Sequence, residues 1–306
     1  MTSNYTQQFG RRQFLASCIT ASASALVKAH AVETLNTQNP LCVFTKPFNS
    51  LTYEDLADRI AKLGFNGIEA PIRKGGHIEP EAVPDELPKL HEALKERGLK
   101  ITVMTSDVND PNDPMTERVL RTAATLGIKR YRMKYFRYDS SQNIQSQLRA
   151  MRSQSIDLAQ MNHQFGIQGL YQNHAGKDYC GASIWDLDVL LDEISPNDIG
   201  VAYDIRHATV EGGVSWPTTW RMIEPRVQTV YVKDFIWGET SRPANVPLGS
   251  GRVSQDFFRL LKKSAYNGPI SLHEEYLDHR DPSLVPDHLE AIKQDFVVLK
   301  SWIDSA

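Results

Sequence analysis

The chain has 306 residues and a formal net charge of −3. A protein that binds duplex nucleic acid normally needs a basic face to neutralise phosphates, but this mildly acidic sequence has no cluster of Lys and Arg interleaved with aromatic residues. Its three cysteines form no CxxC pair and no spacing typical of a zinc site. These features argue against nucleic acid as a partner and against chemistry carried by cysteine.

Residues 1–31 have the features of an export signal. The segment has no acidic residue, carries Arg11-Arg12 ahead of a mild apolar run over residues 14–27, and ends on the small residue Ala31. The run is shorter than the roughly 20 apolar residues that cross a bilayer. We therefore favour a twin-arginine signal cleaved near Ala31 over a membrane anchor, with a lipid anchor at Cys18 as the minor alternative. We expect a periplasmic or otherwise extracytoplasmic protein without stable membrane insertion.

Cleavage would leave residues 32–306 as the folded body. Removing residues 1–31 takes away three positive charges and no negative charge, so the formal net charge moves from −3 to −6. Cys42 falls early in an expected strand and Cys180 in an expected loop. We expect two separate, packed thiols rather than a disulfide.

From residue 40 onward, short β-rich apolar runs alternate with longer segments of helical period, which indicates parallel strands joined by helices. Eight strands are expected, at Leu41–Phe48, Asn66–Ile72, Lys100–Asp107, Arg130–Tyr138, Ile167–His174, Ile199–Ile205, Val227–Phe235 and Pro269–Tyr276. Eight helices are expected between and after them, at Tyr53–Leu63, Asp85–Arg97, Met115–Leu126, Ile144–Phe165, Ile184–Ile194, Trp216–Ile223, Gln255–Ala265 and Leu284–Ile303.

This element order predicts a single-domain α/β protein, a (β/α)8 TIM barrel, which typically needs about 250 residues. The alternative is a doubly wound open sheet with a second domain, but no GxGxxG or GxxxxGK[ST] loop follows any strand. Function in such barrels collects at the C-terminal ends of the strands. The last residues of each expected strand are therefore the candidates for a site.

Strands five and six end in polar residues. Asp204 and His207 lie three residues apart where strand six gives way to its loop. The pair can converge on one divalent ion, although a hydrogen bond that stabilises the loop is the commoner reason for such spacing. Strand five ends in Gln172-Asn173-His174, and period-two alternation aims Gln172 and His174 the same way.

Strands seven and eight add titratable side chains. Alternation places Tyr231 and Lys233 on one side of strand seven, and His273 and Glu275 on one side of strand eight with Ser271. A lysine that faces a barrel interior is costly to bury without a partner. We therefore expect Lys233 to have an acidic partner or a ligand.

Other strands supply weaker candidates. Glu69 ends strand two, Lys46 follows strand one, and Trp237 can stack on a sugar. Strand four carries three cations on one parity: Arg130, Arg132 and Lys134. If that parity faces inward, it forms a cationic wall for anionic or polyhydroxylated ligands, and if it faces outward it is an ordinary solvated stripe.

Taken together, these motifs resemble the xylose isomerase-like TIM barrels. The likeness rests on the Asp-x-x-His of Asp204 and His207, on Gln-Asn-His in strand five where relatives usually have Glu-Asn-His, on Lys-Asp in strand seven, and on the loop Pro247–Gly251. It covers essentially the whole chain after the signal. The group includes ketose epimerases, hydroxypyruvate isomerase, inosose dehydratase, 3-keto-glycoside lyases and endonuclease IV.

The resemblance implies a divalent metal, commonly manganese, held at the barrel mouth by Glu, Asp, His and Glu from strands five to eight. The corresponding residues here are Gln172, Asp204, Tyr231 and His273, so Asp204 is the only unchanged ligand, with His207 beside it. Replacing two carboxylates by an amide and an imidazole should lower manganese affinity. It also removes the acid and base pair of the relatives.

Two functions remain open. In the first, an enzyme rebuilds a metal site from Gln172, Asp204, His207 and His273, selects zinc, cobalt or iron, and acts on a keto-sugar or keto-glycoside. In the second, the metal is lost and a non-catalytic barrel binds a carbohydrate. Candidate residues for binding this small-molecule sugar are His174, Lys134, Tyr231, Trp237, Glu69 and Lys46. The number of titratable groups at one mouth favours the enzyme.

For the enzyme, we expect proton transfer next to a sugar carbonyl. Lys233 or a metal would stabilise the enolate oxygen, and His273 or Glu275 would act as the base.

The export signal makes a direct prediction. The mature protein should begin near Val32 and be recovered outside the cytoplasm, because Arg11-Arg12 directs export and Ala31 suits cleavage. N-terminal sequencing of the exported form tests this. Recovery of an intact N-terminus in the membrane fraction would contradict it.

Overall fold

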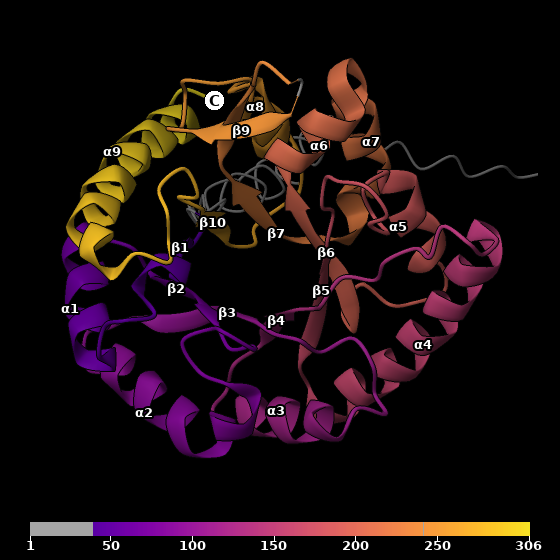
Figure 1. The fold of residues 1–306 in the computed structure, drawn as a ribbon, viewed down its shortest axis with the longest axis horizontal. Coiled ribbons are helices and arrows are strands. Elements are labelled where there is room, and N and C mark those ends of the chain that lie inside the picture. The colour runs from indigo at the N-terminus through magenta and orange to yellow at the C-terminus, as the bar shows by residue number, and fades with distance from the viewer. Residues whose placement is uncertain (1–38, 241) are drawn as a thin grey trace, which may run out of the picture. The chain divides into compact units, whose positions relative to one another are not determined.

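Eight parallel strands form a closed barrel in the computed structural model, which describes residues 39–240 and 242–306 (Figure 1). Around the ring the strands are β1 (Leu41–Phe44), β2 (Gly67–Pro71), β3 (Lys100–Thr105), β4 (Arg130–Arg132), β5 (Gln168–Gln172), β6 (Ile199–Asp204), β7 (Val227–Val232) and β10 (Ile270–Leu272). β1 pairs in parallel with both β2 and β10, which closes the ring. The predicted single-domain (β/α)8 barrel is confirmed.

Helices surround the ring (Figure 1). They are α1 (Tyr53–Leu63), α2 (Val83–Lys95), α3 (Pro114–Thr125), α4 (Ile144–Phe165), α5 (Ile184–Leu190), α6 (Ile205–Gly212), α7 (Trp216–Ile223), α8 (Asp256–Lys263) and α9 (Val285–Asp304). Local signals set their ends. Thr52 and Asn143 cap α1 and α4 through their side chains, and Gly64 and Gly166 follow the same helices with left-handed φ of 87° and 63°.

The observed elements depart from the predicted ones near the strand ends. The first expected strand stops at Phe44 because Lys46–Phe48 turns into a short 3-10 helix. Helix α6 was not predicted, and it begins directly after β6 because the Asp204 side chain caps it. The seventh expected strand divides at Lys233 into β7 and β8 (Asp234–Trp237), and β8 forms an antiparallel hairpin with β9 (Pro243–Val246).

Apolar side chains fill the fold on both sides of the strands. A small cluster of fully buried side chains from four strands has the parity that faces the barrel interior: Val103, Leu170, Ala202 and Tyr231. Residues of the opposite parity pack against the helices, where Tyr203 lies 4.8 Å from Trp220 and 5.6 Å from Phe257 between ring centroids. The inner cluster makes a solid floor beneath the C-terminal end of the barrel.

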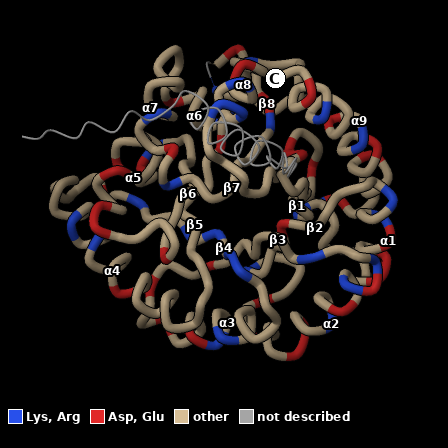
Figure 2. Tube along the Cα trace, turned by 180° about the vertical axis from the view of Figure 1, so that it is seen from behind, with Lys and Arg blue, Asp and Glu red and all other residues tan. Residues whose placement is uncertain are grey.

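The outer helices carry charges of both signs without a large single-sign face, as Figure 2 shows for α1, α2 and α4. Cys42 and Cys180 are buried and unpaired, as predicted. The predicted export signal lies outside the described residues. Among the residues that are described, no helix is both long and apolar enough to cross a membrane.

Asp234, the first residue of β8, anchors the loop that follows the hairpin. Its carboxylate accepts hydrogen bonds from the backbone N–H groups of Gly249, Gly251 and Val253 at 3.0, 2.9 and 2.9 Å. A Cβ on Gly251 would lie 2.3 Å from Asp234 Oδ1, so only glycine permits this approach. The Lys-Asp and Pro247–Gly251 motifs are thus two halves of one structural contact.

Replacing Asp234 by alanine should therefore destabilise the fold. The change leaves three loop N–H groups without their charged acceptor, and we expect the free energy of unfolding to fall by about 2–4 kcal/mol. Urea denaturation measures the change. Asp256→Ala is the control, because that side chain is 61% exposed and its ion pair is with the exposed Arg259. Equal effects of the two substitutions would contradict the anchoring role.

Candidate active site at the barrel mouth

Seven polar residues gather at the barrel mouth, the C-terminal ends of the strands. Here they are termed the mouth network: Glu69, Arg132, Gln172, Asp204, Lys233, His273 and Glu275. Alternation turns them inward, above the apolar floor. All but Glu275 are almost completely buried, whereas the Glu275 side chain keeps 22% exposure. Glu275 is therefore the member that a ligand arriving from solvent meets first.

Glu69 fixes the orientation of His273. Its Oε2 atom lies 2.8 Å from His273 Nε2 and accepts from Ser271 Oγ at 2.8 Å, while Oε1 accepts from Thr105 Oγ1 at 2.7 Å. Burial alone would raise the pKa of Glu69, but His273, Arg132 and Thr105 together outweigh it and hold that pKa at about 2. An ionised carboxylate can only accept, so Nε2 carries a proton, and in the neutral ring Nδ1 presents its lone pair. Nδ1 has no hydrogen-bond partner among the described residues and lies 4.0 Å from Glu275 Oε1.

Gln172 turns a donor towards Asp204. Its Oε1 atom accepts from Arg132 Nη1 at 2.8 Å and from the Tyr135 hydroxyl at 2.5 Å. The amide nitrogen must then face the other way, and it donates to Asp204 Oδ2 at 2.8 Å. A glutamate at this position would place two carboxylates in contact. The amide therefore suits a site in which Asp204 already has its counter-charge.

Lys233 supplies that counter-charge. Its Nζ atom lies 3.2 Å from Asp204 Oδ2 and donates to Glu275 Oε2 at 2.9 Å. Burial lowers the pKa of Lys233, but Asp204 and Glu275 outweigh it and raise that pKa above its ordinary value. Burial would raise the pKa of Glu275, yet Lys233 and His273 hold it well below the usual range. Lys233 and Glu275 are therefore both ionised at neutral pH.

Two imidazoles border the network. His207 Nε2 lies 3.4 Å from Asp204 Oδ2, and Arg206 Nη1 lies 3.1 Å from His207 Nδ1. Because a guanidinium can only donate, Nδ1 is the acceptor and Nε2 carries the proton. Burial and the charge of Lys233 lower the pKa of His207 well below its ordinary value, and burial lowers the pKa of His174 to about 4. The two neutral rings lie 4.1 Å apart between centroids.

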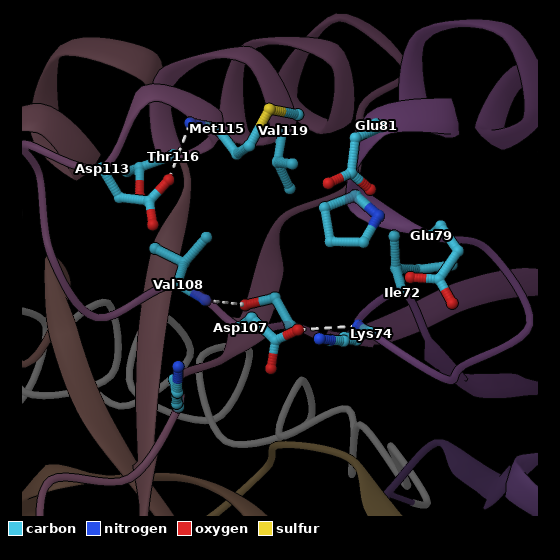
Figure 3. Close-up of a pocket in the computed structure, with 13 residues that line it drawn as sticks. Ile72, Lys74, Glu79, Glu81, Asp107, Val108, Asp113, Met115, Thr116 and Val119 are labelled. Carbon is cyan, nitrogen blue, oxygen red and sulfur yellow. Dashed lines mark hydrogen bonds between the residues drawn. The ribbon is translucent and has the colours of Figure 1, made fainter.

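A hollow of about 360 Å³ lies at the same end of the barrel, beside β2, β3 and β4. Figure 3 shows Val108, Met115 and Val119 on one wall and Asp107 near Lys74 on another. The backbone N–H of Lys74 donates to Asp107 Oδ2 at 2.7 Å. The hollow combines apolar and charged walls, and none of the residues that line it belongs to the mouth network.

The remaining predicted binding residues take different places. Lys134 is exposed and lines the hollow rather than joining the mouth network. Tyr231 belongs to the apolar floor, with its ring 4.6 Å from that of His273. Lys46 is half-buried and interacts electrostatically with Glu275. Trp237 lies on the hairpin, 47% exposed and packed 5.4 Å from Phe235.

The sequence predicted no role for Tyr135 and only a conditional one for Arg132. Arg132 was part of the predicted cationic wall, and its inward parity is now evident from its bond to Gln172 and its 3.8 Å distance to Glu69 Oε1. The alternation that placed Gln172 inward applied equally to Arg132. No local pattern marked Tyr135, which follows β4 in an irregular segment.

The residues present do not fit the divalent metal that the family resemblance implies. Among the described residues, no group of three or more His, Cys, Asp and Glu side chains is placed to hold a metal ion. Gln172 offers an N–H group rather than a lone pair to Asp204, and the Lys233 ammonium contacts the same carboxylate oxygen. His273 uses Nε2 for Glu69. A divalent cation would find these donor groups already paired with other side chains of the network.

Fold and site together define a (β/α)8 barrel with a buried ionic cluster at its mouth. The family model for xylose isomerase-like TIM barrels matches residues 57–301, and the chain belongs to that family. No curated protein matches it in sequence.

Solved structures show the same fold at low identity. The IOLI protein with a bound zinc atom aligns with a TM-score of 0.70 and 15% identity, over 87% of this chain and 98% of its own. A xylose isomerase domain protein from Planctomyces limnophilus aligns with a TM-score of 0.66 and 14% identity, over 86% and 96%. The 3-keto-D-glucoside 4-epimerase YcjR from E. coli aligns with a TM-score of 0.62 and 16% identity, over 88% and 100%. The structural neighbours of the chain described here thus include sugar epimerases.

The depressed pKa of Glu69 predicts a pH-dependent contribution to stability. A folded-state pKa of about 2, below the ordinary value near 4.5, means that the stabilisation is complete above about pH 4.5 and is lost as the pH falls towards 2. Glu69→Gln removes it, so the stability gap between wild type and variant should shrink by up to roughly 3 kcal/mol on acidification.

Urea denaturation of both proteins at about pH 6.5 and about pH 3 measures that gap. A gap of the same size at both values would show that Glu69 does not titrate as its contacts require.

Proposed function

We propose that this protein is an isomerase or epimerase that moves a proton next to the carbonyl of a keto-sugar or keto-glycoside. One observation carries the proposal: Lys233 Nζ lies 2.9 Å from Glu275 Oε2, which places a cation for an enolate oxygen beside a partly exposed carboxylate. The family membership and the epimerase neighbours support the same reaction class. We place the activity outside the cytoplasm, on the strength of Arg11-Arg12.

In the proposed step, Glu275 removes a proton from the carbon beside the carbonyl. The C–H electron pair forms the new carbon–carbon double bond, and the carbonyl π electrons move to the oxygen, which Lys233 holds by charge and hydrogen bonding. Return of a proton to the opposite face gives an epimer, and return to the neighbouring carbon, with transfer of the hydroxyl proton, gives an isomer. Each outcome needs no external oxidant or reductant.

The ion pair explains how a strongly acidic Glu275 can act as a base. Lys233 is the main partner that holds the pKa of Glu275 low against the effect of burial. A substrate oxygen that draws the ammonium away would weaken this pairing and raise the pKa of Glu275. The carboxylate then becomes more basic when the carbonyl to be enolised is in place.

His273 stands behind Glu275 as the second proton acceptor. Its Nδ1 atom lies 4.0 Å from Glu275 Oε1, and Glu69 holds the ring so that this nitrogen is unprotonated in the neutral form. Glu69 acts only through His273 and is therefore a positioning residue. A carboxylate, an imidazole and a second carboxylate thus lie in series from solvent to barrel wall.

A non-catalytic carbohydrate-binding barrel is the second candidate. The observation in its favour is that the carboxylates of the mouth network are all paired within the network, and two family carboxylates are replaced by Gln172 and His273. A sugar would then bind through hydrogen bonds and stacking without proton transfer.

Solvent deuterium exchange tests the reaction directly. In D2O, a panel of ketoses and 3-keto-glucosides should include a compound that exchanges the hydrogen beside its carbonyl, measured by proton NMR. Glu275→Gln should slow that exchange about 100-fold or more, because it removes the general base. Glu290→Gln on α9 is the matched control, since that exposed side chain accepts hydrogen bonds from Lys293 and Gln294 on the same helix.

Two results would change the assignment. Undiminished exchange in a Glu275→Gln, His273→Ala double variant would place the base elsewhere. Saturable sugar binding without exchange for every compound would favour the carbohydrate-binding candidate.

A further inference from the structure

We infer that the Lys233 ammonium occupies the position of a divalent cation in this site, so that the wild-type chain excludes such an ion and loss of the lysine charge admits one. The inference concerns metal binding and does not rest on the proposed reaction. It starts from the contacts of Nζ, which lies 3.2 Å from Asp204 Oδ2 and 2.9 Å from Glu275 Oε2. One cation thus joins two carboxylates from β6 and from the segment after β10.

A buried nitrogen without a hydrogen-bond partner among the described residues lies beside Glu275. His273 is 1% exposed, its Nδ1 atom has no hydrogen-bond partner among the described residues, and that atom lies 4.0 Å from Glu275 Oε1. Glu69 holds Nε2, so the free lone pair of the neutral ring is on Nδ1. Lys233 therefore lies between the carboxylates of Asp204 and Glu275, and the His273 Nδ1 lone pair lies beside Glu275. With the ammonium in place, these three side chains are not arranged to hold a metal ion in the described part of the chain. Two carboxylates and an imidazole are a donor set that zinc or cobalt accepts.

The charges of the network oppose a dication while Lys233 is present. Three carboxylates, on Glu69, Asp204 and Glu275, face the buried cations Arg132 and Lys233. Arg206 and Lys46 add positive charge at the edge, where each interacts with Glu275. A further two positive charges would leave this buried cluster strongly cationic, which is costly away from water.

The donor atoms of Asp204 are also engaged. Its Oδ1 atom accepts from the backbone N–H of His207 at 3.0 Å, and Oδ2 accepts from Gln172 Nε2 at 2.8 Å. Lys233 Nζ contacts the same Oδ2 atom from another side. Removal of the ammonium frees that side of Oδ2 and leaves the carboxylates of Asp204 and Glu275 without the cation that they share. A metal ion restores the balance.

The experiment measures metal binding alone, without sugar. Purified wild type, Lys233→Met and Lys233→Gln are stripped with chelator and then dialysed against Co²⁺, and bound cobalt is determined by elemental analysis and by its visible absorption. Lys233→Arg keeps the positive charge, and Lys263→Met removes an exposed lysine on α8. Circular dichroism establishes that each variant is folded.

We expect wild type, Lys233→Arg and Lys263→Met to hold no stoichiometric cobalt after dialysis. Lys233→Met and Lys233→Gln should bind one ion per chain, with affinity raised at least about 100-fold by the loss of a neighbouring positive charge. Asp204→Asn added to Lys233→Met should abolish that binding.

Three results would overturn the inference. A wild-type chain that retains one ion, lost on Asp204→Asn, would show that lysine and metal coexist. Folded neutral variants that bind no cobalt would show that Lys233 is not what excludes the ion. If both neutral variants fail to fold, the wild-type and Asp204→Asn measurements still decide the point. None of these results bears on whether a keto-sugar exchanges its proton, so the proposed function stands or falls separately.

Discussion

The structure of the mouth depends on one ionic contact, that of Lys233 with Asp204 and Glu275. Burying a charged side chain is costly unless a counter-ion and hydrogen bonds replace its water. Here the ammonium lies between two carboxylates, and the third, on Glu69, lies 2.8 Å from His273 Nε2 in a hydrogen bond and 3.8 Å from the Arg132 guanidinium. Removing either partner of such a pair leaves the other charge buried and unpaired. The contact therefore constrains which residues can surround it, including the amide of Gln172.

The barrel explains how distant residues meet there. Parallel strands end at the same face, and alternation sends every second side chain inward above the floor of Val103, Leu170, Ala202 and Tyr231. The chain departs from the barrel directly after Lys233, and Asp234 on the opposite parity anchors the following loop. A single dipeptide thus contributes one residue to the site and one to its support. The side chain on one face of the strand belongs to the site, and the side chain on the other face stabilises the loop.

Much of the fold followed from the sequence because its signals are local. Strand and helix periods need only neighbouring residues, and they located all eight barrel strands. Helix α6 and the β8–β9 hairpin were missed, since one depends on Asp204 acting as a cap and the other on a strand that breaks at Lys233.

The site was less accessible to sequence reasoning. Alternation correctly placed Gln172, Lys233 and His273 on inward parities, yet it does not specify partners. Glu69 was predicted only as a weak candidate, although it binds His273, 204 residues away in the chain. The sequence does not show this contact because only closure of the ring brings β2 near β10. Lys233 meets Asp204 because β7 pairs directly with β6, with Asp204 in register with Tyr231.

The most direct test of this account is the energetic coupling between Lys233 and Asp204. A double-mutant cycle with Lys233→Met and Asp204→Asn, measured by urea denaturation, gives that coupling free of other contributions. We predict a coupling free energy of roughly 2 kcal/mol or more, because each single change leaves one buried charge without its partner. The double variant should then be more stable than the sum of the two single losses implies. Additive effects, with coupling near zero, would contradict the central role of the ion pair.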